Sequence, residues 1–173
     1  MKEPTNEDLM RQVANGALDQ LKVLFERHHA HVYRFLYKMC RDKMLSEDLA
    51  QEVFYKVMKY RGSYNNGNFV SWLFAIARNS LHSHFKKNGA PTEDIDTVGY
   101  RLAASAAHEE DYSHLQRALD RLAPSDKELI ILNRFQEIRY AELALIVGST
   151  EGAVKTKVSR ALKKLKGFYF EAL

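Results

Sequence analysis

The sequence predicts an all-α protein built from two small helical domains that are joined by a flexible linker. Apolar residues recur at three- and four-residue steps through nearly every long segment, which is typical of the buried face of a helix. No segment alternates apolar and polar residues as a half-buried strand does. We therefore expect helices throughout and no sheet.

Charge divides the 173 residues into three parts. Residues 1–87 carry 14 basic and 9 acidic side chains, residues 88–112 carry 1 and 6, and residues 113–173 carry 11 and 7. We expect residues 1–87 and 113–173 to be the two domains and residues 88–112 to be the acidic linker. Basic modules suit a polyanionic partner, although solvated helical surfaces would give the same totals.

The composition excludes several classes of protein. Hydrophobic residues make up 46% and charged residues 28%, which is ordinary for a globular protein. No apolar run reaches the roughly 18 residues of a membrane span, so we expect no membrane insertion. MKEPTNEDLMRQ lacks the apolar core of a signal peptide, and Cys40 is the only cysteine. A reduced, cytoplasmic protein is the simplest interpretation, with Cys40 as a small buried residue.

The N-terminal domain contains three helical patterns. The first is the apolar stripe of Leu21, Leu24, Phe25, His28, Val32, Phe35, Leu36 and Met39, which predicts a helix pair or one bent helix. Ser46 is the expected N-cap of the next helix, with Glu47 and Asp48 in its first turn and a stripe of Leu49, Val53, Val57 and Tyr60. YRGSYNNGN, residues 60–68, then predicts a loop. A third helix is expected from Phe69 to about Phe85, with Trp72 on its packing face.

The C-terminal domain is expected to start with a helix that carries Leu115, Leu119 and Leu122. Ala123 and Pro124 interrupt the pattern. Ser125, followed three residues later by Glu128, predicts a capping box for the next helix, which should run to about Phe135.

The segment from Tyr140 to Lys166 has the pattern of a helix-turn-helix. Ala144 is small enough for the crossing point of two helices, and Gly148 suits a turn that needs positive φ. The second helix has an inward stripe of Val154, Val158, Ala161 and Leu165. Its outward face carries Thr150, Glu151, Gly152, Lys155, Thr156, Lys157, Ser159 and Arg160, which can reach base edges and phosphates. The alternative is a plain helical hairpin with a basic solvated face. Lys163, Lys164 and Lys166 could be present only because cations near a helix C-terminus interact favourably with the helix dipole. That explanation does not apply to Lys155 and Lys157.

Two longer segments resemble bacterial RNA polymerase sigma factors. SEDLAQEVFYKVMKY followed by FVSWLFAIARNSLHSHFKK resembles sigma region 2, and the segment from Leu119 to Lys166 resembles sigma region 4. A short chain with only these two regions is similar to the extracytoplasmic-function group, group IV of the sigma-70 family. The resemblance covers roughly residues 20–87 and 113–168.

The resemblance implies three sets of contact residues. Asp48, Gln51, Glu52 and Tyr55 would bind the β′ clamp helices of core RNA polymerase, and helical spacing independently places them on one face, away from Leu49, Val53 and Val57. Tyr64, Asn65, Asn66 and Asn68 would capture a flipped base of the minus-ten element, while Arg78, His82, Lys86 and Lys87 would contact duplex DNA just upstream. The outward residues from Thr150 to Arg160 would read the minus-thirty-five element. Glu151 departs from the family pattern, because an acidic side chain at the helix start disfavours phosphate. It could instead accept from a cytosine amino group, or it could simply favour the helix N-terminus.

The expected function is therefore that of a sigma factor that directs promoter-specific initiation, with the β flap and β′ clamp helices of core polymerase and promoter DNA as partners. The resemblance also implies that an anti-sigma factor is a candidate partner. We expect no enzyme activity and no cofactor. We expect no metal either, because no Cys or carboxylate cluster completes His28, His29 and His31.

Two other functions fit the sequence. One is a dimeric helix-turn-helix repressor or activator that works without polymerase, and the other is a helical interaction protein with no DNA role. The sequence fits a closed and an open arrangement of the two domains equally well.

Overall fold

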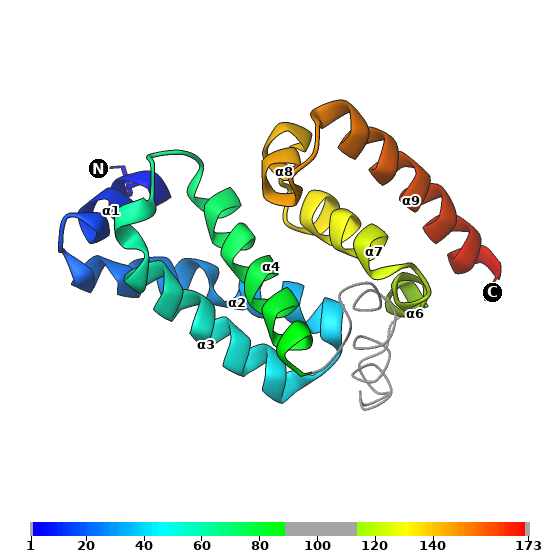
Figure 1. Ribbon diagram of the computed structural model, residues 1–173, viewed down its shortest axis with the longest axis horizontal. Coiled ribbons are helices and arrows are strands. Elements are labelled where there is room, and N and C mark those ends of the chain that lie inside the picture. Colours follow the sequence, from blue (N-terminus) through cyan, green and yellow to red (C-terminus); the bar gives the residue numbers. More distant parts are fainter. Residues whose placement is uncertain (1, 89–113, 172–173) are drawn as a thin grey trace.

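The computed structural model describes residues 2–88 and 114–171, and all regular secondary structure in these two stretches is helical (Figure 1). The predicted all-α class is confirmed. The predicted linker lies outside the described residues, apart from Asn88. The longer helices are α1 (Asn6–Ala14), α2 (Leu21–Cys40), α3 (Lys43–Lys59), α4 (Phe69–Lys87), α6 (His114–Asp120), α7 (Pro124–Ile130), α8 (Tyr140–Val147) and α9 (Glu151–Glu171).

Helices α2, α3 and α4 pack around one apolar core. Phe35 of α2 meets Phe74 of α4 edge to face, with ring centroids 5.7 Å apart, and both rings are fully buried. The first apolar stripe forms one continuous helix, α2, rather than a pair of helices. Leu49, Val53 and Val57 are buried as predicted, whereas Tyr60 is half exposed because it lies just past the end of α3.

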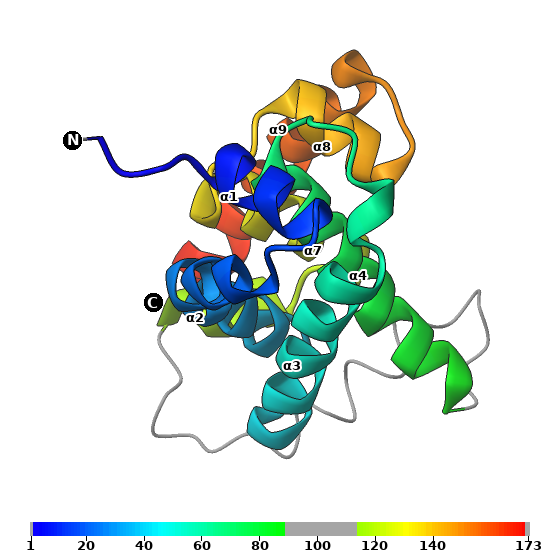
Figure 2. The same ribbon diagram turned by 90° about the vertical axis from the view of Figure 1, so that its left-hand side faces the viewer.

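Helix α1 has no counterpart in the sequence prediction. It lies across one end of the bundle, against α2 and α4, and buries Leu9, Met10 and Val13 (Figure 2). Thr5 caps it, since its hydroxyl oxygen accepts from the Asp8 amide at 3.0 Å. The helix is only nine residues long, and the sequence features that could have predicted it are this capping threonine and the acidic residues in the first turn.

The predicted N-cap at Ser46 is wrong. Asp42 caps α3, because its Oδ1 accepts from the Leu45 amide at 3.0 Å. Ser46 lies one turn inside the helix and is fully buried. Its hydroxyl donates to the Asp42 carbonyl at 2.6 Å, which is the back-bonding that serine makes in a helix interior.

The predicted capping box at Ser125 and Glu128 is also wrong. Helix α7 begins with Pro124 at its first position, after Ala123, and no side chain caps it. Proline is suited to that position because its fixed φ matches a helix and its missing N–H would have had no partner there. The Glu128 carboxylate instead reaches across to α4.

The helix-turn-helix is confirmed. Helix α8 ends at Gly148, whose φ of +69° is in the left-handed region, and Ala144 is buried at the crossing with α9. Thr150 caps α9 through the Ala153 amide at 3.2 Å. The inward residues Val154, Val158, Ala161 and Leu165 are all buried.

The two halves of the chain pack against each other. α7 lies against α2, and α8 lies against α4 (Figures 1 and 2). The buried cluster of the N-terminal bundle therefore continues into the C-terminal half through Leu129, Ile131, Leu132, Ile138 and Leu143. Of the two arrangements that the sequence left open, the structure shows the closed one.

Candidate nucleic-acid interface

A polar face runs along α3. Asp48, Gln51, Glu52 and Tyr55 are all exposed, and α3 lies on the side of the bundle remote from α7, α8 and α9 (Figure 1). Tyr55 is 56% exposed, which is unusual for a large ring. Glu52 forms a 3.3 Å ion pair with Lys56 within the helix. The face is thus an accessible mixture of carboxylates, an amide and an aromatic ring.

The loop from Tyr60 to Asn68 exposes three asparagine side chains just before α4. Asn65 and Asn66 are exposed, and Asn66 has a φ of +64°. Asn68 is also exposed, but its Oδ1 caps α4 by accepting from the Ser71 amide at 2.9 Å. Asn65 Oδ1 accepts from the Gly67 amide at 3.3 Å, so both Asn65 and Asn68 use their side-chain oxygens within the protein and keep their amide N–H groups exposed.

Tyr64 does not have the exposed position expected of a base-stacking ring. Its side chain is buried, with its ring 5.3 Å from Trp72 and 6.3 Å from Phe69, and its hydroxyl donates to the Gly67 carbonyl. Burial raises the pKa of Tyr64, with Glu7 adding to the effect. The half-buried Trp72 packs beneath the loop, as predicted from its spacing.

Helix α1 fixes the other end of this loop. Glu7 Oε2 accepts from the Phe69 amide at 2.9 Å, at the start of α4. This role of Glu7 was not predicted from the sequence. The only local signal was an acidic residue in the first turn of a short helix, and nothing local could have identified a partner 62 residues away.

The basic residues of α4 fall into two groups. Lys86 and Lys87 are exposed at the end of the helix. Arg78 and His82 instead contact Glu128, at 2.5 Å from Arg78 Nε and 2.9 Å from His82 Nε2. Arg78 Nη1 also donates to the Ile146 carbonyl at 3.5 Å. Two of the four predicted duplex contacts are thus covered by the C-terminal half.

The outward face of α9 is open. Thr150, Glu151, Gly152, Lys155, Thr156, Lys157, Ser159 and Arg160 are all exposed. The Thr156 hydroxyl donates to the Gly152 carbonyl at 3.0 Å, which fixes its rotamer. Gly152 has open space around the position of a β-carbon, so the backbone there can be approached closely.

The histidines near residue 28 do not form a site. His28 is buried, and its Nε2 lies 3.0 Å from Asn6 Oδ1. Burial lowers the pKa of His28 to about 4, with a smaller contribution from His31. Among residues 2–88 and 114–171, no group of three His, Cys, Asp or Glu side chains converges as metal ligands would. Burial also raises the pKa of the Cys40 thiol, which makes it a poor nucleophile.

The chain carries two candidate DNA-binding surfaces. One is the exposed face of α9 in the helix-turn-helix, and the other is the basic end of α4 with the asparagine loop that precedes this helix. This is the layout of a bipartite DNA-binding protein. Comparison with known families agrees: sigma-70 region 2 matches residues 24–90, and sigma-70 region 4 matches residues 113–165.

Whole-chain relatives point the same way. RNA polymerase sigma factor CarQ of Myxococcus xanthus is 32% identical, over 91% of this chain and 93% of that protein. ECF RNA polymerase sigma factor SigM of Bacillus subtilis is 30% identical, over 84% of this chain and 93% of that protein. The chain belongs to the extracytoplasmic-function (ECF) group of the sigma-70 family of RNA polymerase sigma factors.

Solved structures share the fold. The sigma factor RpoE of Bartonella quintana, in complex with the anti-sigma factor NepR, superimposes with a TM-score of 0.70 at 27% identity, over 85% of this chain and 94% of that one. CnrH in complex with the cytosolic domain of CnrY gives a TM-score of 0.71 at 19% identity, over 94% and 95%. Within the described residues, no helix is long and apolar enough to cross a bilayer.

Proposed function

We propose that this sigma factor divides promoter recognition among three surfaces: α3 for core polymerase, the Asn65–Asn68 loop with α4 for the minus-ten element, and α9 for the minus-thirty-five element. Members of the family are initiation factors and not enzymes, so the chemistry of RNA synthesis belongs to the polymerase. The observation that carries the proposal is the open face of α9 on the same chain as the open face of α3.

The α3 face suits a protein partner. Asp48 and Glu52 can pair with basic residues of the β′ clamp helices, and Tyr55 supplies an exposed ring of the kind that is enriched at interfaces. The Leu49, Val53 and Val57 side anchors the helix to the bundle, so the contact surface is rigid. The C-terminal domain would meet the β flap of the same enzyme.

The loop suits an unpaired base. Asn65, Asn66 and Asn68 have amide groups that can donate to and accept from a base edge, as base-flipping proteins require. We assign Tyr64 a supporting role, because its ring is packed between Phe69 and Trp72 beneath the loop. Lys86 and Lys87, with Arg78 and His82, would hold the adjoining phosphates.

The start of α9 suits the major groove. Lys155, Lys157 and Arg160 can contact phosphates and guanine edges, while Thr156 and Ser159 provide short hydrogen-bonding groups. Glu151 lies in the first turn, where a carboxylate favours the helix dipole and can also accept from a cytosine amino group.

Regulation by an anti-sigma factor is part of the proposal. It is supported by the similarity to RpoE, which was solved in complex with the anti-sigma factor NepR. We also propose a cytoplasmic location, where bacterial RNA polymerase acts.

Run-off transcription tests the proposal. Purified protein and core polymerase are incubated with promoter fragments from the source genome, without an inhibitor, and specific transcripts are expected. Asp48→Ala with Gln51→Ala should weaken binding to core polymerase, whereas Lys22→Ala, an exposed change on α2, should not. An absence of transcripts from every fragment would refute the sigma function. Unchanged affinity of the Asp48/Gln51 variant would remove the α3 assignment alone.

A further inference from the structure

The Glu7 side chain connects the first turns of two helices that are far apart in the sequence. Glu7 is in the first turn of α1, which Thr5 caps. Its Oε2 also accepts from the amide of Phe69, the first residue of α4, at 2.9 Å. The first N–H groups of a helix lack partners within it and carry a partial positive charge. The Glu7 carboxylate therefore lies where both helices favour an anion.

The start of α4 depends on two acceptors. The local one is Asn68, whose Oδ1 accepts from the amide and the hydroxyl of Ser71 at 2.9 and 3.1 Å. The distant one is Glu7, 62 positions before Phe69. The Phe69 ring is fully buried and the hydrogen bond from its amide is partly buried. Because a buried N–H without a partner is costly, loss of Glu7 would loosen the first turn of α4.

Helix α1 is itself fastened to α2, so it gives Glu7 a rigid support. Asn6, the residue before Glu7, uses its Oδ1 to accept from Arg27 Nη1 at 3.1 Å, and the same oxygen lies 3.0 Å from His28 Nε2. The apolar face of α1 is buried against α2 and α4. The position of the Glu7 carboxylate is thus set by the bundle and not by the loop before α4.

Helix α1 contacts both ends of the loop that precedes α4. It lies against the short turn Arg61–Ser63 at one end, and Glu7 holds Phe69 directly after the other end. Between these ends, the side-chain oxygens of Asn65 and Asn68 are used within the protein, which leaves their amide N–H groups for a ligand. The direction of the Asn68 donors depends on its oxygen staying on the first turn of α4, and Glu7 keeps that turn in place.

We infer that Glu7 is a positioning residue for base capture: it fixes the first turn of α4 and so keeps the N–H groups of Asn65 and Asn68 directed at an unpaired base. The inference rests on the minus-ten role proposed above for the loop. Glu7 does not itself contact the base. It acts by ordering the loop before binding, because each side chain that must be ordered on binding lowers affinity by about two- to tenfold.

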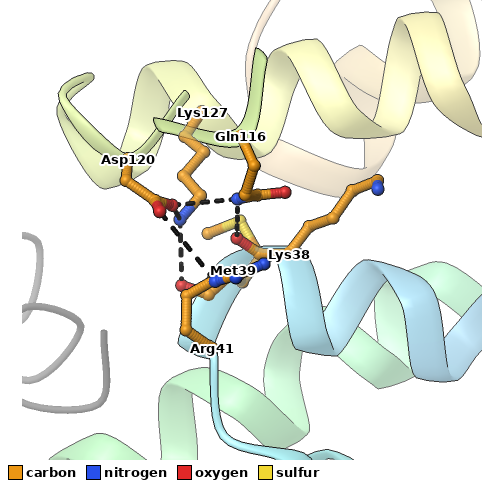
Figure 3. Close-up of polar contacts among 6 residues, drawn as sticks. All are labelled: Lys38, Met39, Arg41, Gln116, Asp120 and Lys127. Carbon is orange, nitrogen blue, oxygen red and sulfur yellow. Dashed lines mark hydrogen bonds and ion pairs between the residues drawn. The ribbon is translucent and has the colours of Figure 1, made fainter. Parts of the chain in front are cut away.

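Two substitutions separate the reach of Glu7 from its charge. Glu7→Gln keeps the length of the side chain and an oxygen that can accept from the Phe69 amide, but it removes the charge. Glu7→Asp keeps the charge in the first turn of α1, but it is one methylene shorter and withdraws the oxygen from Phe69. Gln116→Ala is the control, because it removes a different hydrogen bond from a side chain to the end of a helix, the 3.3 Å contact with the Lys38 carbonyl of α2 (Figure 3). Urea unfolding checks that every variant is folded.

The assay measures binding of each protein, complexed with core polymerase, to a fluorescent forked promoter fragment from the source genome whose minus-ten strand is unpaired. An abasic site is moved along this strand, and the position at which it weakens wild-type binding most identifies the captured base. The loss should be about tenfold, as expected for a stacked and hydrogen-bonded base. Glu7→Gln and Gln116→Ala should keep this ratio, whereas in Glu7→Asp it should fall to about threefold. All the proteins should bind the abasic fragment equally, because phosphate contacts do not depend on the loop.

Four results would overturn the inference: a wild-type ratio in Glu7→Asp, a ratio in Glu7→Gln as low as in Glu7→Asp, an equal fall in the Gln116→Ala control, or a matching loss of affinity for the abasic fragment. The last of these is what a merely structural role of Glu7 would give. If wild type itself is insensitive to the abasic site at every position, base capture by the loop is refuted, and the inference with it. Failure of the proposed base capture and failure of the Glu7 assignment are therefore distinguishable.

Discussion

Replacing His28 by glutamine should remove much of the acid sensitivity of the fold. His28 is buried beside Phe69 and bonded to Asn6, and burial lowers its pKa to about 4 from 6.5. Above pH 6.5 the side chain is neutral in both the folded and the unfolded chain. As the pH falls from 6.5 towards 4, only the unfolded chain binds a proton at this residue, so the folded state loses stability across that window.

The expected loss follows from the size of the shift. One pKa unit corresponds to about 1.4 kcal/mol, so a fall from 6.5 to about 4 amounts to about 3 kcal/mol by pH 4. This is a large part of the roughly 5–15 kcal/mol by which a folded domain is typically stable. Glutamine keeps a hydrogen-bonding group near Asn6 but cannot be protonated, so this contribution should vanish.

Urea unfolding at several pH values between about 7.5 and 4 measures the effect. The free energy of unfolding of His28→Gln should start lower than that of wild type and then converge with it as the pH falls. His84→Gln is the matched control, because it makes the same substitution at the end of α4, where His84 bonds to Asn88 and is not part of the buried core. Parallel curves for wild type and His28→Gln would refute this reasoning.

Three further outcomes are expected. Phe74→Ala should lower the free energy of unfolding by about 3–5 kcal/mol, measured in urea, because it empties a fully buried position in the core; a loss below about 1 kcal/mol would contradict this placement. Asn66→Gly should leave stability nearly unchanged, since its φ of +64° suits glycine, and should reduce transcript yield from a melted minus-ten template if the amide contacts a base. Lys163 and Lys166 are exposed on α9, which continues past them to Glu171, so they are available for phosphates and do not serve the end of the helix. Lys163→Gln with Lys166→Gln should therefore flatten the salt dependence of duplex binding by about two phosphate contacts and leave sequence preference intact, which competition with unrelated duplexes can check.

The parts of the fold that the sequence predicted correctly are those with local causes. Gly148 ends α8 because the turn needs positive φ, and Val154 and Val158 are buried because their spacing puts them on one face of α9. Such features depend on neighbours a few residues away. The exposed α3 face follows from the same periodicity.

The sequence predictions that are wrong concern residues whose contacts depend on the tertiary structure. Ser125 and Glu128 have the spacing of a capping box, but Glu128 is drawn to Arg78, 50 residues earlier in the chain. Ser46 has the residue type of an N-cap, but Asp42 begins the helix and Ser46 is needed inside it. Tyr64 looked available in a loop of polar residues, yet Trp72 and Phe69 supply a packing site for its ring. A single sequence does not reveal such pairings.

Arg41 shows how one position can serve two opposed demands. It ends α2 with a φ of 59°, a conformation in which glycine is more stable than arginine by about 1 kcal/mol. Yet its guanidinium lies over the Tyr37 ring at 4.6 Å and 3.9 Å from Asp120 of the other domain. Arg41→Gly would relax the backbone of the bundle while loosening its hold on the C-terminal half. Selection for a more stable bundle and selection for a tighter closed form would therefore favour different residues at this one turn.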